Sequence, residues 1–156
     1  MKKLFLLVLV ALCFSLTTKA QEESTTTSSY KDAVGIRLSS TVPAIKNGIT
    51  YKHFIGANAI EGILSFGDGV GICGLYEIHK PLNATTEGLQ WLIGFGGYVG
   101  INNSTSNIGA AGIIGLDYKF AQVPLNLTLD WKPELNIVSK VGFEASGVGF
   151  SARFTF

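Results

Sequence analysis

Hydrophobic and polar residues alternate with a period of two along most of the chain after residue 30. The pattern is clearest in the segment 148–156. Its apolar set is Val148, Phe150, Ala152, Phe154 and Phe156, and its other set is Gly149, Ser151, Arg153 and Thr155. Successive side chains of a strand point to opposite faces, so this segment is predicted to be a β-strand with one continuous apolar face. An open edge of this kind would promote aggregation in water, whereas a closed barrel in a bilayer has no open edge.

The same alternation predicts seven further strands, separated by turn residues. They fall in the segments 34–38, 49–55, 60–66, 70–78, 89–101, 108–120 and 125–132. Segment 49–55 alternates poorly, so the facing of its side chains stays open. Short connections make neighbouring strands antiparallel, and strands of roughly ten residues suit a membrane-spanning barrel. The sequence therefore predicts an all-β fold: an eight-stranded antiparallel transmembrane β-barrel with up-and-down meander topology, over residues 32–156.

The N-terminal residues have a different pattern, which predicts a cleaved signal peptide before the barrel. Lys2 and Lys3 precede an apolar run at 4–16, and Thr18-Lys19-Ala20 is a small-residue cleavage site. The run is shorter than the roughly 20 apolar residues that a spanning helix needs. Residues 1–20 are therefore predicted to be a signal peptide, and the polar residues 21–31 a disordered periplasmic leader.

Composition excludes several classes of function. Removal of residues 1–20 leaves nine basic and eleven acidic residues, a formal charge near −2, so no basic patch for nucleic acid is expected. Cys73 is then the only cysteine, which excludes an internal disulfide and a cysteine metal cluster. No cofactor and no metal is predicted.

The C-terminal segment resembles the assembly signal of bacterial outer-membrane barrels, because Phe156 follows Phe150 and Phe154 at alternate positions. In that family the last strand is read by the barrel assembly machinery and closes the barrel against the first strand. The run 124–133 is similar to one in small outer-membrane β-barrel proteins of Gram-negative bacteria, whose activity is undefined. The resemblance implies a location in the cell outer membrane, contact with its lipid, and the assembly machinery as a partner during biogenesis.

Aromatic residues near the predicted strand ends suit the girdles of a membrane barrel. These residues are Trp91, Tyr118, Phe120 and Trp131. With the N-terminus in the periplasm, the connections near residues 41, 67, 102 and 139 are expected to face outside.

Ten charged residues are predicted to point into the barrel. They are Arg37, Lys52, Lys119, Lys132 and Arg153, and Glu61, Glu77, Asp117, Asp130 and Glu134. An eight-stranded barrel is just wide enough for side chains to fill it, and buried charges are costly unless they are paired. The balance of signs therefore predicts a polar lumen plugged by ion pairs, without a continuous channel.

This plug favours a structural role in the cell envelope, and no enzymatic activity. Small barrels that modify lipid A resemble the chain in size, but they need a group such as histidine near the outer leaflet. His53 and His79 are predicted at the periplasmic side, although Glu77 lies in reach of His79. Three alternatives stay open: adhesion or binding of an unidentified envelope protein through the loops 102–107 and 139–146, a narrow porin-like channel, and a lipid-modifying enzyme.

Overall fold

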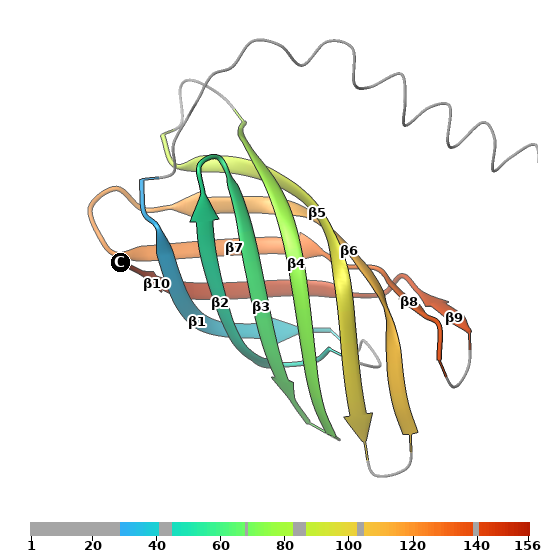
Figure 1. Cartoon of the computed structure of the whole chain (residues 1–156). Helices are drawn as coiled ribbons and strands as arrows, with labels where there is room; N and C mark the ends of the chain where they lie inside the picture. The colour runs from blue at the N-terminus through green and yellow to red at the C-terminus, as the bar shows by residue number, and fades with distance from the viewer. Residues whose placement is uncertain (1–28, 41–44, 68, 83–86, 103–104, 139–140) are drawn as a thin grey trace, which may run out of the picture.

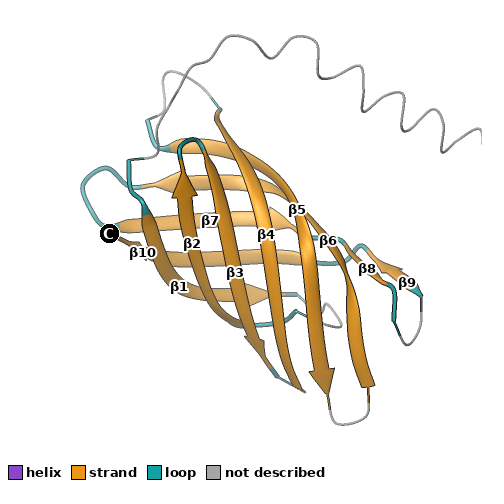
Figure 2. Cartoon of the chain, viewed as in Figure 1, coloured by secondary structure: helices purple, strands orange, loops and turns teal. Residues whose placement is uncertain are grey.

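The computed structural model describes residues 29–40, 45–67, 69–82, 87–102, 105–138 and 141–156. Every regular element in these ranges is a β-strand (Figure 2). The predicted signal peptide and residues 21–28 of the predicted leader lie outside the described residues. In the described ranges there is no helix of the length and hydrophobicity needed to cross a membrane.

The described strands form one closed antiparallel barrel. They are β1 (Asp32–Ser39), β2 (Gly48–Ile55), β3 (Asn58–Phe66), β4 (Gly69–Pro81), β5 (Leu89–Asn102), β6 (Thr105–Lys119), β7 (Leu125–Trp131), β8 (Glu134–Asn136), β9 (Gly142–Glu144) and β10 (Val148–Thr155). From β1 to β7 each strand pairs with the next, β8 pairs with β6 and β9, and β10 pairs with β7 and closes the circle by pairing with β1 (Figure 1). Because β7 with β8 and β9 with β10 each make up one wall strand, the predicted eight-stranded antiparallel barrel is confirmed.

Pro133 interrupts the seventh wall strand without changing its register. Trp131 at the end of β7 pairs with Ile114, and Glu134 at the start of β8 pairs with Ala111. The two pairs are equally far apart on both strands. Proline lacks the N–H that a ladder needs, which accounts for the interruption. The seventh strand therefore extends beyond the predicted end at residue 132.

A β-bulge divides the eighth wall strand. Val148 in β10 pairs with Trp131, whereas Glu144 in β9 pairs with Glu134. The three residues 145–147 thus oppose two residues of the seventh strand, and a bulge of this kind bends the strand that carries it.

Two predicted loops are wrong. Asn102 pairs with Thr105, so most of the segment 102–107 belongs to the hairpin of β5 and β6. The segment 139–146 contains β9, which pairs with β8. Both segments have polar, turn-rich sequences, but a long neighbouring strand offers them a ladder, and this tertiary context overrides local preference.

Gly56 makes the tight turn between β2 and β3. It lies between the paired residues Ile55 and Asn58, and its φ of 67° is in the left-handed region that glycine adopts without steric cost. This turn fixes the register of the hairpin. It also settles the facing of β2: Thr50, Lys52 and Phe54 are buried inside the barrel.

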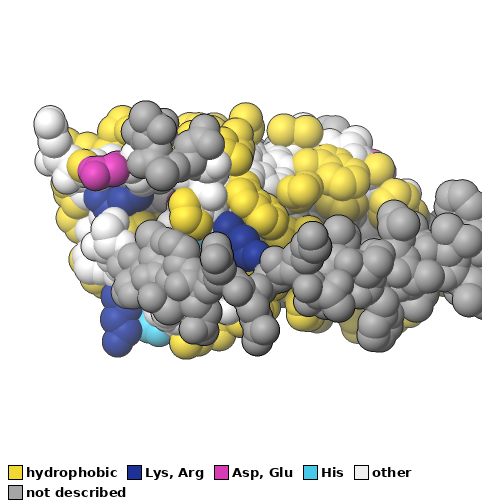
Figure 3. All heavy atoms as spheres, turned by 90° about the horizontal axis from the view of Figure 1, so that it is seen from above, with side chains coloured by type: hydrophobic (Ala, Val, Ile, Leu, Met, Phe, Trp, Pro, Cys, Tyr) yellow, Lys and Arg dark blue, Asp and Glu magenta, His cyan; other side chains and the backbone are white. Residues whose placement is uncertain are grey.

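The outer surface of the wall is apolar. Side chains such as Ile72, Phe95 and Ile101 are 61%, 68% and 59% exposed. Hydrophobic side chains cover much of the described surface in Figure 3, and few charged side chains are in view. The side chains that alternate with them point inward and are buried.

The interior contains an apolar sector that the sequence reading did not assign. Its buried members come from β3 to β6 and from the segment just before β2. They are Ile45, Ile63, Cys73, Leu75, Leu92, Tyr98, Ala111 and Ile113. The alternation carries the signal for most of them, since Ile63 lies in phase with the charged Glu61 and Leu75 lies in phase with Glu77. Charge alone was therefore an incomplete guide to the inner face.

The folded part begins before Asp32. Phe54 N donates to Lys31 O at 2.8 Å, and the Tyr30 ring packs edge-on against Phe54 with centroids 5.0 Å apart. Tyr30 and Lys31 were predicted to belong to the disordered leader. Both residues instead contact the barrel, because the Tyr30 ring packs on the buried ring of Phe54 and Lys31 O accepts a backbone hydrogen bond.

Candidate functional site

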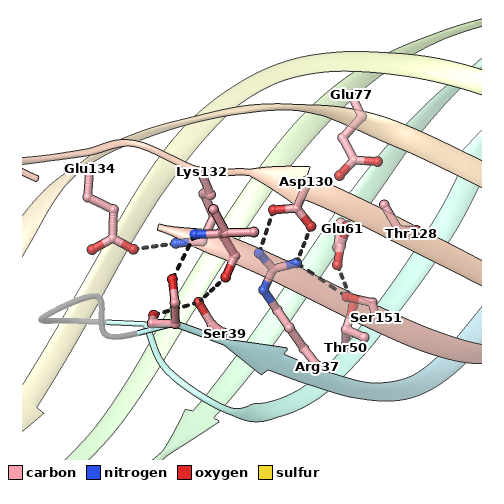
Figure 4. A network of polar contacts seen from close by, with 12 residues as sticks. Arg37, Ser39, Thr50, Glu61, Glu77, Thr128, Asp130, Lys132, Glu134 and Ser151 are labelled. Carbon is pink, nitrogen blue, oxygen red and sulfur yellow. Dashed lines mark hydrogen bonds and ion pairs between the residues drawn. The ribbon is translucent and has the colours of Figure 1, made fainter. Parts of the chain in front are cut away.

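Nine of the ten charged residues predicted to face inward are buried inside the barrel. They are Arg37, Lys52, Glu61, Glu77, Asp117, Asp130, Lys132, Glu134 and Arg153. Figure 4 shows part of this network, with side chains from opposite sides of the barrel pointing toward one another. The strands that carry these residues hold them in phase on the inner face.

Lys119 is the exception, and its predicted place in the network is wrong. Its backbone is in phase with Asp117, but Nζ donates to the backbone oxygens of Phe120 and Val123 at 2.5 and 3.0 Å. Lys119 is the last residue of β6, so its long side chain reaches the adjacent turn more easily than the interior. The described interior consequently holds four cationic side chains and five carboxylates, besides His79.

Arg37 and Asp130 form a bidentate ion pair. Nη1 and Nη2 of Arg37 lie 2.7 and 2.6 Å from the two carboxylate oxygens of Asp130, and both side chains are fully buried (Figure 4). Nη1 also donates to Ser151 Oγ at 3.2 Å. A Cβ added to Gly149 would lie 2.1 Å from Arg37 Nη2. The glycine in β10 therefore makes room for this pair.

Lys132 and Glu134 form a second buried pair along the seventh wall strand. They are two residues apart, so both point inward even though Pro133 lies between them. The unchanged register across Pro133 is what keeps them in phase.

Arg153 is the centre of the largest polar cluster. Its Nη2 lies 2.5 Å from Glu61 Oε1, and its Nη1 donates to Thr128 Oγ1 at 2.6 Å and to Asn126 Oδ1 at 3.2 Å. Its Nε donates to Thr50 Oγ1 at 3.2 Å. One guanidinium thus joins β10 to β2, β3 and β7. Such multiple hydrogen bonding offsets the cost of burying a charge.

Lys52 lies among three carboxylates. Its Nζ is 2.8 Å from Glu77 Oε2, 3.3 Å from Asp117 Oδ2 and 3.6 Å from Glu61 Oε2. Lys52 comes from the strand whose facing the sequence left open, and the three carboxylates come from β3, β4 and β6. The ammonium therefore links β2 to three strands that also carry residues of the apolar sector.

His79 lies at the end of this cluster, under two aromatic rings. Its Nε2 is 2.9 Å from Glu77 Oε2, and its ring packs edge-on against Phe54 with centroids 4.8 Å apart. Tyr30 packs on the other side of Phe54, and burial raises the pKa of the Tyr30 hydroxyl above its ordinary value. The three rings cover the charged cluster at the barrel end where β1 begins and where Phe156 lies.

The three phenylalanines of the predicted assembly signal all lie on the outer face. Phe150, Phe154 and Phe156 are 42%, 56% and 63% exposed, and the rings of Phe154 and Phe156 stack at 6.4 Å. Their β10 strand pairs with β1, which is the closure that the resemblance implied.

The four predicted girdle residues all lie near the ends of strands. Trp91 is near the start of β5, and Tyr118 packs edge-on against Phe120 at the end of β6 with centroids 4.7 Å apart. Trp131 is the last residue of β7, and β8 continues the same wall strand in register beyond it. Its Nε1 donates to Ala145 O in the bulge at 2.6 Å.

His53 takes part in a polar group on the outer face that the sequence did not reveal. Its Nδ1 lies 2.7 Å from Asp32 Oδ1, and Tyr51 Oη donates to the same oxygen at 2.5 Å. Tyr51 and His53 share one face of β2, which was the only signal in the sequence. Their meeting with Asp32 depends on the register of β1 against β2.

Glu77 lies beside His79 as the sequence suggested, and His79 is buried beneath Phe54. In the described part of the chain, no group of three or more His, Cys, Asp or Glu residues is placed to hold a metal ion. The polar groups of the interior bind one another instead.

No family model, curated protein or solved structure matches this chain. The function must therefore be inferred from the barrel, its outer surface and its interior network.

Proposed function

We propose that the protein is an integral outer-membrane β-barrel with an interior closed by packed side chains, and that its role in the envelope is structural and not catalytic. The observation that carries this proposal is the distribution of side chains across the wall. Arginine, lysine and carboxylate side chains are fully buried, whereas isoleucine, leucine and phenylalanine side chains are exposed. This distribution is inverted relative to a protein that folds in water.

The apolar wall supports a membrane location. Soluble monomers rarely expose contiguous apolar patches larger than a few hundred Å², and apolar side chains of the described strands are exposed on β1 to β10. Lipid would cover this surface. A closed barrel also satisfies its backbone hydrogen bonds between strands, which a hydrocarbon environment requires.

The filled interior argues against a channel. Arg37 and Arg153 reach across neighbouring strands to Asp130 and Glu61. The apolar sector fills the side formed by β3 to β6. Since an eight-stranded barrel has little space beyond its own side chains, no porin-like passage is proposed.

The resemblance of the C-terminal residues supports the outer membrane over other membranes. Phe150, Phe154 and Phe156 lie on the outer face of the strand that closes the barrel against β1. In the family that the chain resembles, this is the strand that the assembly machinery reads.

Fractionation of a Gram-negative cell that expresses the full chain tests the location. We expect the protein in the outer-membrane fraction, resistant to a urea wash and released only by detergent. Recovery of folded protein in the soluble fraction without detergent would contradict the proposal.

Conductance measurements on the purified protein in a planar bilayer test the closed interior. We expect no steps of current above the bare bilayer, with a larger porin as the positive control. Reproducible current steps would show that the interior conducts, and the location could still hold.

Partner binding is a second candidate function, favoured by the hairpin of β8 and β9. Beyond the bulge, Val141 and Phe143 are 75% and 67% exposed, more than most apolar residues of the wall. Crosslinking on intact cells tests this candidate: a V141S/F143S variant should lose a crosslinked envelope protein that the V70S variant, altered on another strand, retains.

A further inference from the structure

The buried charges of the described interior do not balance. Asp130 is paired with Arg37, and Glu134 with Lys132. The remaining cluster contains three carboxylates but only two permanent cations. The carboxylates are Glu61, Glu77 and Asp117, and the cations are Lys52 and Arg153. All five are buried. A net charge in a closed interior is costly, so the imbalance must be compensated.

Asp117 is compensated as a carboxylate. Its Oδ1 accepts from Asn126 Nδ2 at 2.6 Å, and its Oδ2 accepts from Thr128 Oγ1 at 2.7 Å and from Lys52 Nζ at 3.3 Å. Both oxygens thus have donors. An ionised carboxyl group is acceptor-only, and this environment suits it.

Glu61 and Glu77 are each less completely bonded. Glu61 Oε1 accepts hydrogen bonds from Arg153 Nη2 and from Thr50 Oγ1, each at 2.5 Å. Glu77 Oε2 forms an ion pair with Lys52 and lies beside His79 Nε2. Glu61 Oε2 and Glu77 Oε1 are buried without a hydrogen-bond donor. Both carboxyl groups share the ammonium of Lys52, whose Nζ lies 3.6 Å from Glu61 Oε2 and 2.8 Å from Glu77 Oε2. One cation cannot balance two carboxylates, so a proton on one of them would remove the excess negative charge.

His79 is the other group that can take a proton. Its Nε2 lies 2.9 Å from Glu77, and its Nδ1 is buried without a partner. An imidazolium would neutralise the cluster as well as a protonated carboxyl group would.

We propose that the barrel interior is a proton-binding site, in which one proton is held at neutral pH by the group formed by Glu61, Glu77 and His79. With this proton the cluster is neutral. The proton also adds a hydrogen-bond donor to a cluster in which two carboxylate oxygens lack one. The inference rests on the closed interior and its charge count, and it does not require the membrane location.

The groups that face this site come from most of the barrel wall. Lys52 lies on β2, Asp117 on β6 and Arg153 on β10, and Arg37 on β1 and Tyr30 before it are the other titratable groups near the cluster. The two cations, Lys52 and Arg153, can balance two of the three carboxylates. Phe54 and Tyr30 cover His79, so exchange of the proton with solvent requires these rings to move.

Infrared spectroscopy of the unmodified protein tests the site directly. In an ester-free detergent at neutral pH, we expect either the carbonyl stretch of a buried protonated carboxylic acid, which shifts in D₂O, or an NMR signature of imidazolium at His79. Either result supports the site and identifies the group that holds the proton. If neither signal is present at neutral pH, the proposal is wrong, whether or not any variant folds.

Glu77→Gln provides a second test, because an amide mimics a protonated carboxyl group in shape and charge. We expect its unfolding equilibrium constant to stay within about tenfold of the wild-type value, and any carboxylic-acid band to disappear. Asp130→Asn is the matched control: it breaks a balanced pair, and we expect its constant to rise by more than about a hundredfold. Equal losses in the two variants would mean that removing the charge of Glu77 is as costly as removing that of Asp130. The cluster would then hold no excess negative charge, and the proposal would be overturned.

Discussion

The guanidinium of Arg37 reaches past β10 to hold the carboxylate of Asp130 on β7 in two hydrogen bonds of 2.7 and 2.6 Å. β1 pairs with β10, and β10 pairs with β7, so the ion pair spans the closing strand from the inside. Both side chains are fully buried. The pair therefore fastens the first wall strand to the seventh at the place where the barrel closes.

Removing one partner of this pair should strongly destabilise the barrel. Arg37→Met leaves the Asp130 carboxylate buried without its cation, which costs about 3–5 kcal/mol in comparable cases. Urea unfolding in detergent micelles, followed by tryptophan fluorescence, measures the effect. The R37M/D130L variant should recover most of the loss, because an apolar pair of similar volume leaves no buried charge. A loss below about 1 kcal/mol in R37M would contradict a fastening role for the pair.

Gly149→Ala should also weaken the closure. The new methyl group would lie 2.1 Å from Arg37 Nη2, and the bond to Asp130 prevents the guanidinium from moving away freely. Overpacking of this kind costs about 1–3 kcal/mol. The same unfolding assay applies. Gly74→Ala is the control, since a Cβ there meets no atom within 4 Å, and equal effects at the two positions would argue against the clash.

Trp131→Phe should loosen the bulge of the eighth wall strand. The substitution removes the indole hydrogen bond to Ala145 O, a contribution of about 0.5–1.5 kcal/mol. Hydrogen exchange at the backbone amides of residues 144–148 reports on the bulge locally. We expect faster exchange there in W131F and no change in W91F. Unchanged exchange in W131F would mean that the bulge is held by its other bonds, among them Ser146 N to Glu144 Oε1.

Alkaline pH should destabilise the barrel through Tyr30. Burial raises the pKa of its hydroxyl above the ordinary value of 10.0, so the folded state keeps a proton that the unfolded chain releases. Stability is therefore complete below about pH 10 and falls as the pH rises above it, by up to about 1.4 kcal/mol per pH unit. Tyr30→Phe should remove this part of the pH dependence. If Y30F and wild type lose stability equally, Tyr30 does not stay protonated inside the barrel.

The barrel and the facing of most side chains could be predicted from the sequence alone, because both follow from the alternation of apolar and polar residues within each strand. Arg37, Lys52, Asp130 and Arg153 could be assigned to the inner face from their phase against apolar neighbours. The same rule placed Phe150, Phe154 and Phe156 on the outer face.

Tertiary structure decided how those side chains meet. Lys119 left the interior because β6 ends there and its side chain reaches the adjacent turn. Trp131 meets the bulge through Ala145, and β9 forms because β8 offers it a ladder. Tertiary structure likewise gathers Glu61, Glu77 and His79 into one group around an excess of negative charge. Alternation tells which face a residue occupies, but the register between strands and the closure of the barrel fix its height and its neighbours. Those are relations between residues far apart in the chain, which no local pattern records.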